Sequence, residues 1–563
     1  MRQWWMGKNI YQIYLRSFMD GNHDGIGDIP GVIMKLPYLK SIGIEIIWIS
    51  PHYDSPMDDY GYDVRDFYRV SSDYGTIDDF KQLITEAHQI GIKVIIDLVL
   101  NHTSDEHPWF QAAKDPNHPE HVKYHDYYIW HKPKTDDAGL MQPPTSWIGW
   151  FGDRTWTYHP LTDEYYLHIF SKKMPDLNWR NHEMIDDMKR MILWWVAQGV
   201  DGFRLDAANH LEKNWEFPEA YPGYEHFSSL PKHHDYLHML SEEIFKPHDL
   251  LILGESGGAN KAEALAYVGY HQGSMNMLIQ FGHCWADIDP TQPQLGKWSQ
   301  GVVDVVKIKK SFQTWYQILG HDGWNLIYWH NHDQPRIISH YGSDRRYHAR
   351  SGKMLAIALY LMPGSCICYQ GEEIGMVNVR FRKLEQFRDV EVFTEYDNMR
   401  RMGKTKRQAL RLLSRRCRDN ARTPMQWTHG AYAGFSPVQP WIDMSGRKHT
   451  INVQSQSHDP SSILSLYRFL LKLRRSDDNI TFGTIEFIDI DHPDSFCYRT
   501  VGATCEYLVI TNFRNRTISV QLDDIHKFAP VTGSLKRIPP LKNRMVLAPF
   551  AAFVYRRTRR RES

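Results

Sequence analysis

The sequence predicts an α/β protein: a (β/α)8 TIM barrel with a lid domain inserted after the third strand and an antiparallel β domain at the C-terminus. Two observations carry this prediction. Eight short apolar, β-rich runs recur up to residue 372, and helix-like segments lie between them. Alternating strands and helices indicate a parallel sheet, and eight such units close naturally into a barrel. After about residue 482 strands alternate without helices, which indicates a separate β domain.

The predicted elements follow in order along the chain. The barrel strands are residues 10–18, 44–50, 94–101, 202–208, 250–255, 275–281, 325–333 and 366–372. Amphipathic patterns at 77–90, 183–198 and 352–361 predict helices between them. In the β domain, the predicted strands are residues 484–489, 496–501, 506–512, 518–522 and 545–555.

Two long connections set the predicted domain boundaries. About a hundred residues, rich in Pro, Trp, His and Tyr, separate the third and fourth strands, and an insertion there would lie over the barrel mouth as a lid. A charged, helix-like insertion near 380–433 follows the eighth strand. We therefore predict residues 1–101 as the first part of the barrel, 102–173 as the inserted domain B, 174–481 as the second part of the barrel, and 482–563 as the C-terminal β domain.

The composition excludes several classes of protein. Lys plus Arg and Asp plus Glu both total 66, so the formal net charge is zero, and most nucleic-acid and membrane-surface binders are not neutral. No apolar stretch approaches the length of a membrane span, and the first residues do not resemble a signal peptide. The six cysteines are sparse and irregularly spaced, which favours a reducing compartment. We expect a cytoplasmic protein with neither a nucleic-acid nor a membrane partner, of undetermined oligomeric state.

Polar residues collect at the ends of four predicted strands. The third strand ends in DLVLNH at 97–102, the fourth contains GFRLD at 202–206, the fifth ends in GE at 254–255, and the seventh ends in NHD at 331–333. Active sites of this barrel lie at the C-terminal ends of the strands, so these carboxylates, arginine and histidines are expected to meet there. Arg204 and Asp206 are two residues apart on one strand, and both therefore point into the barrel.

These strand ends carry the groups needed to cleave a glycosidic bond. That reaction uses two carboxyl groups in unlike environments, one ionised to attack the anomeric carbon and one protonated to release the leaving oxygen. Asp206 fits the first role because the neighbouring Arg204 favours its ionised form. Glu255 fits the second role because it ends the apolar run 250–253, whose burial would raise its pKa. The chemistry needs no organic cofactor.

The strand ends DLVLNH, GFRLDAANH, GESG and HNHD, in chain order, resemble the four signature regions of the α-amylase superfamily, glycoside hydrolase family 13. Further motifs are similar to those of its oligo-1,6-glucosidase, dextran glucosidase and α-glucosidase group. They are YQIYLRSF at 11–18, DYGYD at 59–63, HDQPR at 332–336, YQGEE at 369–373 and RDNARTP at 418–424. The resemblance covers the chain from about residue 5 to the C-terminal β domain, and it implies a hydrolase acting on small oligosaccharides.

The resemblance implies a role for each matching residue. Asp206 is the expected nucleophile, Glu255 the general acid and base, and Asp333 the carboxylate that binds ring hydroxyls and steadies the transition state. The residues expected to bind the substrate are Asp59, Tyr62, His102, Arg204, His332 and Arg422. Among them, Arg204 holds the nucleophile and Tyr62 stacks under the sugar. Asp59 and Arg422 hold the O4 end of the non-reducing glucose and block that side of the pocket, so such enzymes remove one glucose at a time.

A loop after the first strand predicts a metal site. The sequence DGNHDGIGD at 20–28 places oxygen ligands at alternate positions, like the first half of an EF-hand loop, although Gly31 stands where an EF-hand has its Glu. In the resembled group the same loop binds Ca²⁺ or Mg²⁺. The resemblance therefore implies the ligands Asp20, Asn22, Asp24, the carbonyl of Ile26, and Asp28. We expect a structural ion, because the loop holds none of the three catalytic acids.

The residue after the nucleophile bears on linkage. In the resembled group a Val there accompanies α-1,6 specificity and an Ala or Thr accompanies α-1,4 specificity, so Ala207 favours α-1,4-linked malto-oligosaccharides. Met174 also replaces a Gln of the oligo-1,6-glucosidase pattern. An α-1,6-specific oligo-1,6-glucosidase or dextran glucosidase stays open, and so does a transglucosylase or sucrose isomerase that uses the same glucosyl-enzyme intermediate. A non-catalytic, transporter-associated relative is disfavoured because all three acids are present.

Overall fold

The computed structural model describes residues 2–256 and 261–559. Its centre is a sheet of eight parallel strands in the spatial order β13, β12, β11, β5, β2, β1, β15, β14. Their bounds are β1 Asn9–Ile13, β2 Ile46–Ile49, β5 Lys93–Val99, β11 Gly202–Asp206, β12 Leu251–Glu255, β13 Met277–Ile279, β14 Leu326–Ile327 and β15 Ser365–Tyr369. β13 and β14, at the two ends of this order, lie beside each other and nearly close the barrel.

Each of the eight predicted barrel strands overlaps one observed strand, so the predicted barrel is confirmed. The seventh strand is much shorter than predicted. β14 has only two residues, and the rest of the predicted run, 328–333, leaves the sheet as a loop that carries His332 and Asp333.

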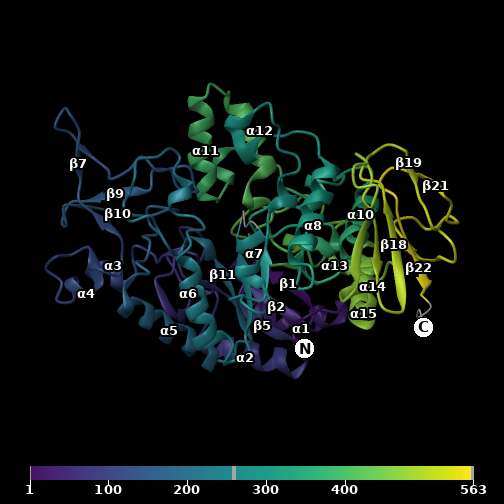
Figure 1. Cartoon of the computed structure of the whole chain (residues 1–563), viewed down its shortest axis with the longest axis horizontal. Coiled ribbons are helices and arrows are strands. Elements are labelled where there is room, and N and C mark those ends of the chain that lie inside the picture. Colours follow the sequence, from purple (N-terminus) through teal and green to yellow (C-terminus); the bar gives the residue numbers. More distant parts are fainter. Residues whose placement is uncertain (1, 257–260, 560–563) are drawn as a thin grey trace.

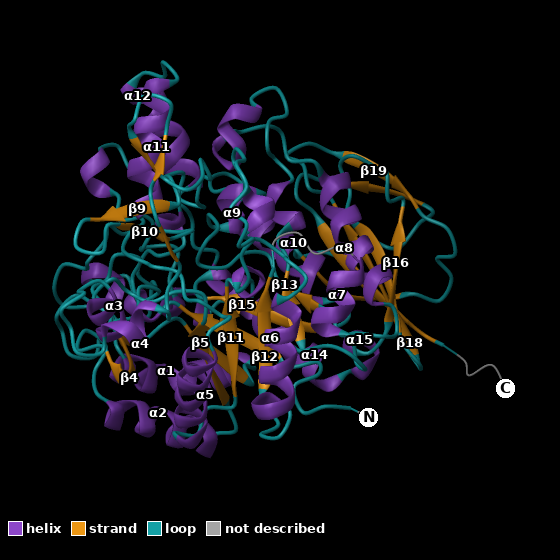
Figure 2. Cartoon of the chain, turned by 60° about the vertical axis from the view of Figure 1, so that its left-hand side comes forward, coloured by secondary structure: helices purple, strands orange, loops and turns teal. Residues whose placement is uncertain are grey.

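Helices cover the outside of the sheet (Figure 2). They are α1 Ile29–Ile42, α2 Ile77–Gln89, α5 His182–Ala197, α6 His233–Leu240, α7 Lys261–Val268, α8 Val305–Leu319, α9 Ile337–His340, α10 His348–Tyr360, α13 Val453–Ser457, α14 Ile463–Ser476 and α15 Asp478–Thr481. Local sequence explains where they begin: Thr76 and Asp79 form a capping box at α2, and Asp28 caps α1 by accepting from the Gly31 N–H. The helices predicted at 77–90, 183–198 and 352–361 are confirmed.

The inside of the barrel is apolar at its base. Side chains that alternate along the strands point inward and form one buried cluster, which includes Ile10, Ile46, Trp48, Ile95, Leu251, Leu253, Met277, Ile279, Leu326 and Ile367. The next inward positions are polar: Gln12 on β1, Asp97 on β5, Arg204 and Asp206 on β11, and Glu255 on β12. The alternation of each strand therefore aims these polar side chains at the mouth of the barrel.

The chain between β5 and β11 builds a unit outside the barrel, at the left of Figure 1. It contains α3 Pro108–Ala113, α4 His121–His125, β6 Trp130–His131, β7 Lys134–Thr135, β8 Met141–Gln142, β9 Trp156–His159 and β10 Glu164–Leu167. Trp147 and Trp156 pack in its core together with Phe217 and Phe227, which follow β11. A second, smaller excursion is the antiparallel pair β3 Tyr53–Asp54 and β4 Asp66–Val70.

Two helices follow β15 and project at the top of Figure 1. They are α11 Val390–Arg401 and α12 Lys406–Arg416, and both lie within the helical insertion predicted near 380–433. The chain reaches the barrel mouth again at Arg418, two residues after the end of α12. The predicted domain boundaries themselves stay predictions.

The C-terminal part is antiparallel, as predicted. One sheet has the order β16 Thr484–Ile488, β17 Cys497–Val501, β18 Cys505–Thr511, β22 Ala552–Thr558 and β20 Ala529–Gly533, and β19 Ile518–Gln521 pairs with β21 Arg544–Leu547. The single strand predicted at 545–555 is wrong, because a turn at Pro549 and Phe550, where φ is 51°, divides it into β21 and β22. The sequence also missed β20, whose APVTG lacks an alternating apolar pattern.

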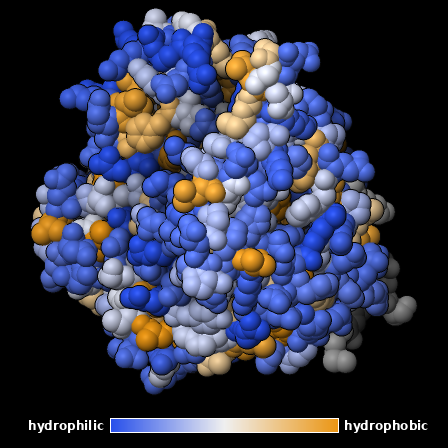
Figure 3. Space-filling view, turned by 90° about the vertical axis from the view of Figure 1, so that its left-hand side faces the viewer, coloured by the Kyte–Doolittle hydropathy of each residue, from blue (hydrophilic) through white to orange (hydrophobic). Residues whose placement is uncertain are grey.

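The surface in Figure 3 is mostly hydrophilic, with small scattered hydrophobic patches. Within the described residues, no helix combines the length and the apolar character needed to cross a membrane. Gly257 of the GESG motif and residues 560–563 of the predicted β domain lie outside the described residues.

Candidate active site

A cavity of about 610 Å³ opens at the C-terminal ends of the barrel strands. Seven of the nine side chains predicted for catalysis and substrate binding line it: Asp59, Tyr62, His102, Asp206, Glu255, His332 and Asp333. The other two, Arg204 and Arg422, are 0% and 1% exposed and lie behind its wall. The structure therefore brings all nine together, with the two arginines supporting the residues that face the cavity.

Arg204 is the centre of a carboxylate cluster at the base of the cavity. Its Nη1 is 2.6 Å from Asp97 Oδ1 and 2.6 Å from Asp206 Oδ1, and its Nη2 contacts Glu255 Oε2. The sheet sets this geometry, because Arg204 lies opposite Asp97 on β5 and opposite Leu253 on β12. One guanidinium thus holds three carboxyl groups, and Asp206 and Glu255 lie side by side on it.

Burial and charge perturb the two cavity-lining acids of this cluster. Burial raises the pKa of Glu255 to about 7 against the opposing effect of Arg204, and the charges of Asp333 and Asp97 raise it further. Burial also raises the pKa of Asp206, although Arg204 lowers it. The predicted effect of Arg204 on Asp206 is present but smaller than that of burial. Since three carboxyl groups share one cation, a single proton within the cluster relieves the excess negative charge.

Two histidines face the cavity in their neutral form. Burial lowers the pKa of both His102 and His332 to about 3. The Gln12 amide donates to His332 Nδ1 at 2.8 Å, so the ring proton lies on Nε2, which is 2.7 Å from the Tyr62 hydroxyl and 3.2 Å from Asp333 Oδ2. Among the described residues, His102 Nε2 has no hydrogen-bond partner. Both rings line the cavity, where a sugar hydroxyl can reach them.

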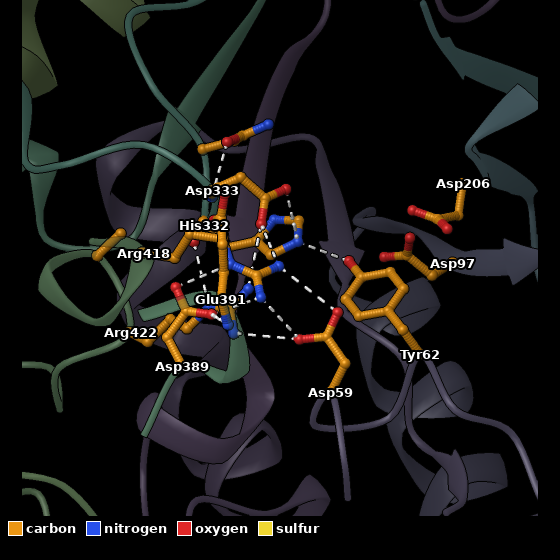
Figure 4. A network of polar contacts seen from close by, with 12 residues as sticks. Asp59, Tyr62, Asp97, Asp206, His332, Asp333, Asp389, Glu391, Arg418 and Arg422 are labelled. Atoms are coloured by element: carbon orange, nitrogen blue, oxygen red, sulfur yellow. Dashed lines mark hydrogen bonds and ion pairs between the residues drawn. The ribbon is translucent and has the colours of Figure 1, made fainter. Parts of the chain in front are cut away.

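A second cluster of charges closes the opposite end of the cavity (Figure 4). Arg418 Nη2 is 3.0 Å from Asp59 Oδ1 and 2.6 Å from Asp389 Oδ1, and Arg418 Nε donates to Asp389 Oδ2 at 3.0 Å. Its Nη1 lies 3.5 Å from Asp333 Oδ1. Arg422 Nη2 is 3.1 Å from the same Asp333 oxygen, and its Nη1 is 3.6 Å from Asp59 Oδ1. Two guanidinium groups and three carboxylates thus form one network.

Two of the three carboxylates of this second cluster, Asp333 and Asp389, are held ionised. Burial alone would raise the pKa of Asp333. The electrostatic effects of His332, Arg418 and Arg422 outweigh burial and hold this pKa well below its usual value. The pKa of Asp389 falls to about 2, because Arg418 outweighs burial there too. Asp59 differs, since burial raises its pKa more than Arg418 and Arg422 lower it.

Two arginines reach Asp59: Arg422, as expected from the sequence, and Arg418, which the sequence did not single out. The sequence assigned the partner of Asp59 to Arg422, but Arg418 makes the shorter contact with Asp59 and lines the cavity. Arg422 lies deeper and donates through Nε to the His332 carbonyl at 3.3 Å. The motif RDNARTP contains both arginines, so the sequence held the signal, but spacing alone does not tell which one points inward.

Sequence reasoning missed the residues at the rim of the cavity. Trp150 is 40% exposed, and its ring stacks on that of Tyr224, with centroids 4.7 Å apart and planes 8° from parallel. On the helical insertion, Glu391 is paired with Lys297 at 2.6 Å. All four side chains line the cavity, and aromatic faces of this kind suit the apolar faces of sugars. No motif marked them: Trp150 comes from the predicted domain B, Glu391 from α11, and Tyr224 and Lys297 from the segments that follow β11 and β13.

The predicted metal loop is closed by hydrogen bonds to its own backbone. Asp20 accepts from the N–H groups of His23 and Gly25, and Asp28 accepts from those of Asn22 and Gly31. The oxygen donors fit the chemistry of Ca²⁺. In the part of the chain that the structure describes, no group of three or more His, Cys, Asp or Glu side chains has a metal-binding arrangement. Any ion here would depend on Asn22 and the Ile26 carbonyl as well, and the site stays a prediction.

Comparisons with known proteins agree with this geometry. The profile of the alpha-amylase catalytic domain family matches residues 12–483. The chain is 39% identical to an oligo-1,6-glucosidase from Bacillus cereus, with 99% of each chain covered. Among solved structures, a trehalose-6-phosphate hydrolase from Bacillus licheniformis superimposes with a TM-score of 0.90 at 36% identity, covering 99% of this chain and 100% of that one. An isomaltulose synthase from Klebsiella sp. LX3 superimposes with a TM-score of 0.92 at 32% identity and the same coverage.

Proposed function

Because this chain belongs to the α-amylase family of glycoside hydrolases, we propose that it is a retaining, exo-acting α-glucosidase. It releases glucose from the non-reducing end of short α-glucosides, with α-1,4-linked malto-oligosaccharides as its substrates. The observation that carries the proposal is the placement of Asp206 and Glu255 on one guanidinium at the base of the cavity. Retaining enzymes need their two carboxyl groups about 5–5.5 Å apart, and the contact of both groups with one guanidinium supports a short separation of this kind.

The two acids divide the reaction into two displacements. Glu255 donates its proton to the glycosidic oxygen as an Asp206 carboxylate oxygen attacks the anomeric carbon, so the leaving sugar departs and a glucosyl ester forms on Asp206. Glu255, now ionised, takes a proton from water, and the water oxygen attacks the same carbon and releases Asp206. A pKa of about 7 for Glu255 suits a group that gives and then takes a proton.

The other cavity residues bind the glucose that is transferred. Asp333, held ionised by Arg418 and Arg422, accepts hydrogen bonds from ring hydroxyls and stabilises the positive charge that develops at the anomeric carbon. His102 and His332 offer their Nε2 atoms to the same sugar. Arg418 and Asp59 close the end of the cavity away from Arg204, which supports removal of a single terminal glucose.

Ala207 supports the α-1,4 assignment. It follows Asp206, lines the cavity and has φ 49° and ψ 37°, a left-handed conformation that disfavours β-branched residues such as Val. The small side chain leaves room beside the bond to be cleaved. The second candidate is α-1,6 specificity, which is favoured by the 39–41% identity to proteins named oligo-1,6-glucosidase.

A transglucosylase or sucrose isomerase would share the first displacement and differ only in the acceptor of the glucosyl group. The structural likeness to an isomaltulose synthase keeps this alternative in view. The outcome depends on whether water or a sugar occupies the space next to the glucosyl ester. Trp150, Tyr224 and the Lys297–Glu391 pair line the cavity and would influence which of the two binds there.

A panel of disaccharides tests the proposal. The protein is incubated with maltose, isomaltose, sucrose, trehalose and trehalose 6-phosphate, and products are followed by proton NMR from the first turnover. We expect the highest kcat/KM with maltose, and α-glucose as the first product because configuration is retained. Preference for isomaltose would replace the linkage assignment, transfer products without free glucose would replace hydrolysis, and β-glucose as first product would reject the two-step mechanism. A Glu255→Gln variant measured in parallel controls for contaminating glucosidases.

Two further parts of the proposal concern the setting of the enzyme. We infer a structural Ca²⁺ or Mg²⁺ held by Asp20, Asn22, Asp24, the Ile26 carbonyl and Asp28, which would tie the loop after β1 to the start of α1. We also infer a cytoplasmic location, supported by six cysteines that are all free and buried.

A further inference from the structure

A second hollow lies beside α12, on the insertion that follows β15, and has a volume of about 1070 Å³. Among the described residues, it shares no lining residue with the sugar cavity. Its walls come from α12, from the loop at 380–382, from the turn at 344–345 and from the segment near Asp287. Four segments that are distant in sequence therefore converge on one concave surface.

The charge of this hollow is strongly one-sided. Eight arginine or lysine side chains line it, against the two carboxylates of Asp287 and Asp344. The Asp287 carboxylate already has partners, because Arg416 Nη2 lies 2.7 Å and His340 Nε2 lies 2.8 Å from its Oδ1. Among the described residues, none of the other seven cations forms an ion pair. In a chain whose formal net charge is zero, this cluster is a local excess and does not reflect the overall composition.

The cations crowd one another. The pKa of Arg415 is lowered by burial and then by the neighbouring charges of Arg411 and Arg380. An adjoining hollow of about 660 Å³ shares Arg345, Arg380 and Arg382, so the positive surface continues around the base of the insertion. In Figure 3 the top of the molecule, where α11 and α12 project in Figure 1, carries hydrophilic residues beside a hydrophobic patch. Like charges at this density repel, and a bound anion would relieve the repulsion.

We propose that this hollow is a binding site for a small oligophosphate, a ligand that carries two or more phosphate groups close together. Arginine forks match phosphate oxygens in bidentate geometry, and most of the cations here are arginines. The hollow is concave and slightly larger than most small-molecule sites, which measure about 300–1,000 Å³. Phe381 and Leu410 contribute only a small apolar part to its wall, because they are 4% and 6% exposed.

Calorimetry on the full chain tests the site with tripolyphosphate as the probe. We expect wild-type protein to bind tripolyphosphate at low salt and inorganic sulfate at least tenfold more weakly, because one dianion meets only part of the cluster. The variant Arg382→Gln/Arg411→Gln/Arg415→Gln removes three exposed cations of the hollow, and should weaken tripolyphosphate binding at least tenfold. Adenosine triphosphate and a hexose bisphosphate, tested next, distinguish a nucleotide from a sugar source of the phosphates, and tighter binding of either than of tripolyphosphate supports the site.

The matched control removes three cations elsewhere. Lys536→Gln/Arg537→Gln/Lys542→Gln, on exposed positions of the C-terminal domain, lowers the net charge by the same amount and should change the affinity less than twofold. Equal losses in the two triple variants would overturn the proposal, and so would absence of tripolyphosphate binding by wild-type protein. An RNA decamer that binds through the three arginines, where tripolyphosphate does not, would also overturn it and indicate a nucleic-acid surface. Glucosidase activity of both variants should equal that of wild type.

Discussion

The two ends of the sugar cavity are built from the same materials in different proportions. At the base, the single cation Arg204 holds the carboxyl groups of Asp97, Asp206 and Glu255. At the opposite end, Arg418 and Arg422 together hold the carboxylates of Asp59, Asp333 and Asp389. The residue types are the same, and the ratio of cations to carboxyl groups is one to three at the base and two to three at the far end.

This difference decides where a proton can reside. At the base the excess negative charge and burial raise the pKa of Glu255 to about 7, so a proton is available near neutral pH. At the far end the two arginines hold the pKa of Asp333 well below its usual value and that of Asp389 at about 2, so both are fixed anions. One end is thereby suited to proton transfer, and the other to binding hydroxyl groups and stabilising positive charge.

Removing the nucleophile should give the largest effect. The Asp206→Ala substitution takes away the atom that forms the glucosyl ester, so we expect kcat to fall roughly 10⁴-fold or more. Hydrolysis of p-nitrophenyl α-glucoside measures it. The melting temperature should change little, because Asp206 faces the cavity and Arg204 keeps Asp97 and Glu255 as partners.

Chemical rescue separates a nucleophile from a residue that only positions others. Azide is small enough to occupy the space that the Asp206→Ala change leaves, and it should restore turnover and yield β-glucosyl azide by a single displacement. Wild-type-like activity in the variant, or a lack of rescue in a well-folded protein, would contradict the role of Asp206.

Two conservative substitutions test the roles of the two arginines at the far end of the cavity. Arg418→Lys keeps the charge but loses the forked contact to Asp59 and Asp389, and we expect kcat/KM to fall about 100-fold, mainly through KM. Arg422→Lys should cost about tenfold, because Arg422 lies behind the cavity wall and contacts Asp59 only at 3.6 Å. A larger loss for Arg422→Lys would restore the sequence-based pairing of Asp59 with Arg422.

A substrate lacking O4 on its glucose tells whether Arg418 acts on that oxygen. Wild-type enzyme should lose about as much with the 4-deoxy substrate as Arg418→Lys loses with the normal one, and the two changes together should cost little more than either alone. Fully additive losses would show that Arg418 only maintains the structure.

The raised pKa of Glu255 predicts the pH profile. Glu255 must be protonated for the first displacement, so kcat/KM for maltose should fall tenfold per pH unit above an apparent pKa of about 7. α-Glucosyl fluoride, whose leaving group needs no proton, should show a much weaker decline. The fixed anions of the far end should add no titration near neutral pH. An equally steep decline with the fluoride would mean that another group titrates.

The base of the cavity was readable from the sequence, and the far end only in part. Strand periodicity places Arg204 and Asp206 on the inner face of β11, and the ends of parallel strands meet at one edge, so Glu255 and Asp206 had to come together. The fold followed from the same alternation. β20 and the break in the last predicted strand were not predicted, because short strands with few apolar residues lack that alternation.

The far end is built from loops, and no periodic pattern in the sequence predicts the path of a loop. Arg418 and Arg422 lie four residues apart in a short irregular segment, and only the path of the chain after α12 decides which guanidinium reaches the cavity. Asp389 and Glu391 arrive from the start of α11, and Trp150 from domain B. Long-range packing of two insertions fixes these positions, and neither propensity nor a local motif reports on it.

The smallest expected change in activity is at the base of the cavity, at Ala207, the residue next to the nucleophile. The Ala207→Val substitution narrows the cavity beside the bond to be cleaved, and should lower the maltose to isomaltose ratio of kcat/KM about fivefold to tenfold, the effect of one or two methyl groups in a pocket. Because φ at this position is 49°, Val also strains the backbone, so the melting temperature must be measured, and Ala207→Thr serves as an equally β-branched control. If Val and Thr lower both activities in proportion, strain at the nucleophile explains the loss, and Ala207 does not set the linkage. A fall confined to maltose in the Val variant would instead show that the pocket beside Asp206 selects the linkage, independently of the cluster around Arg418.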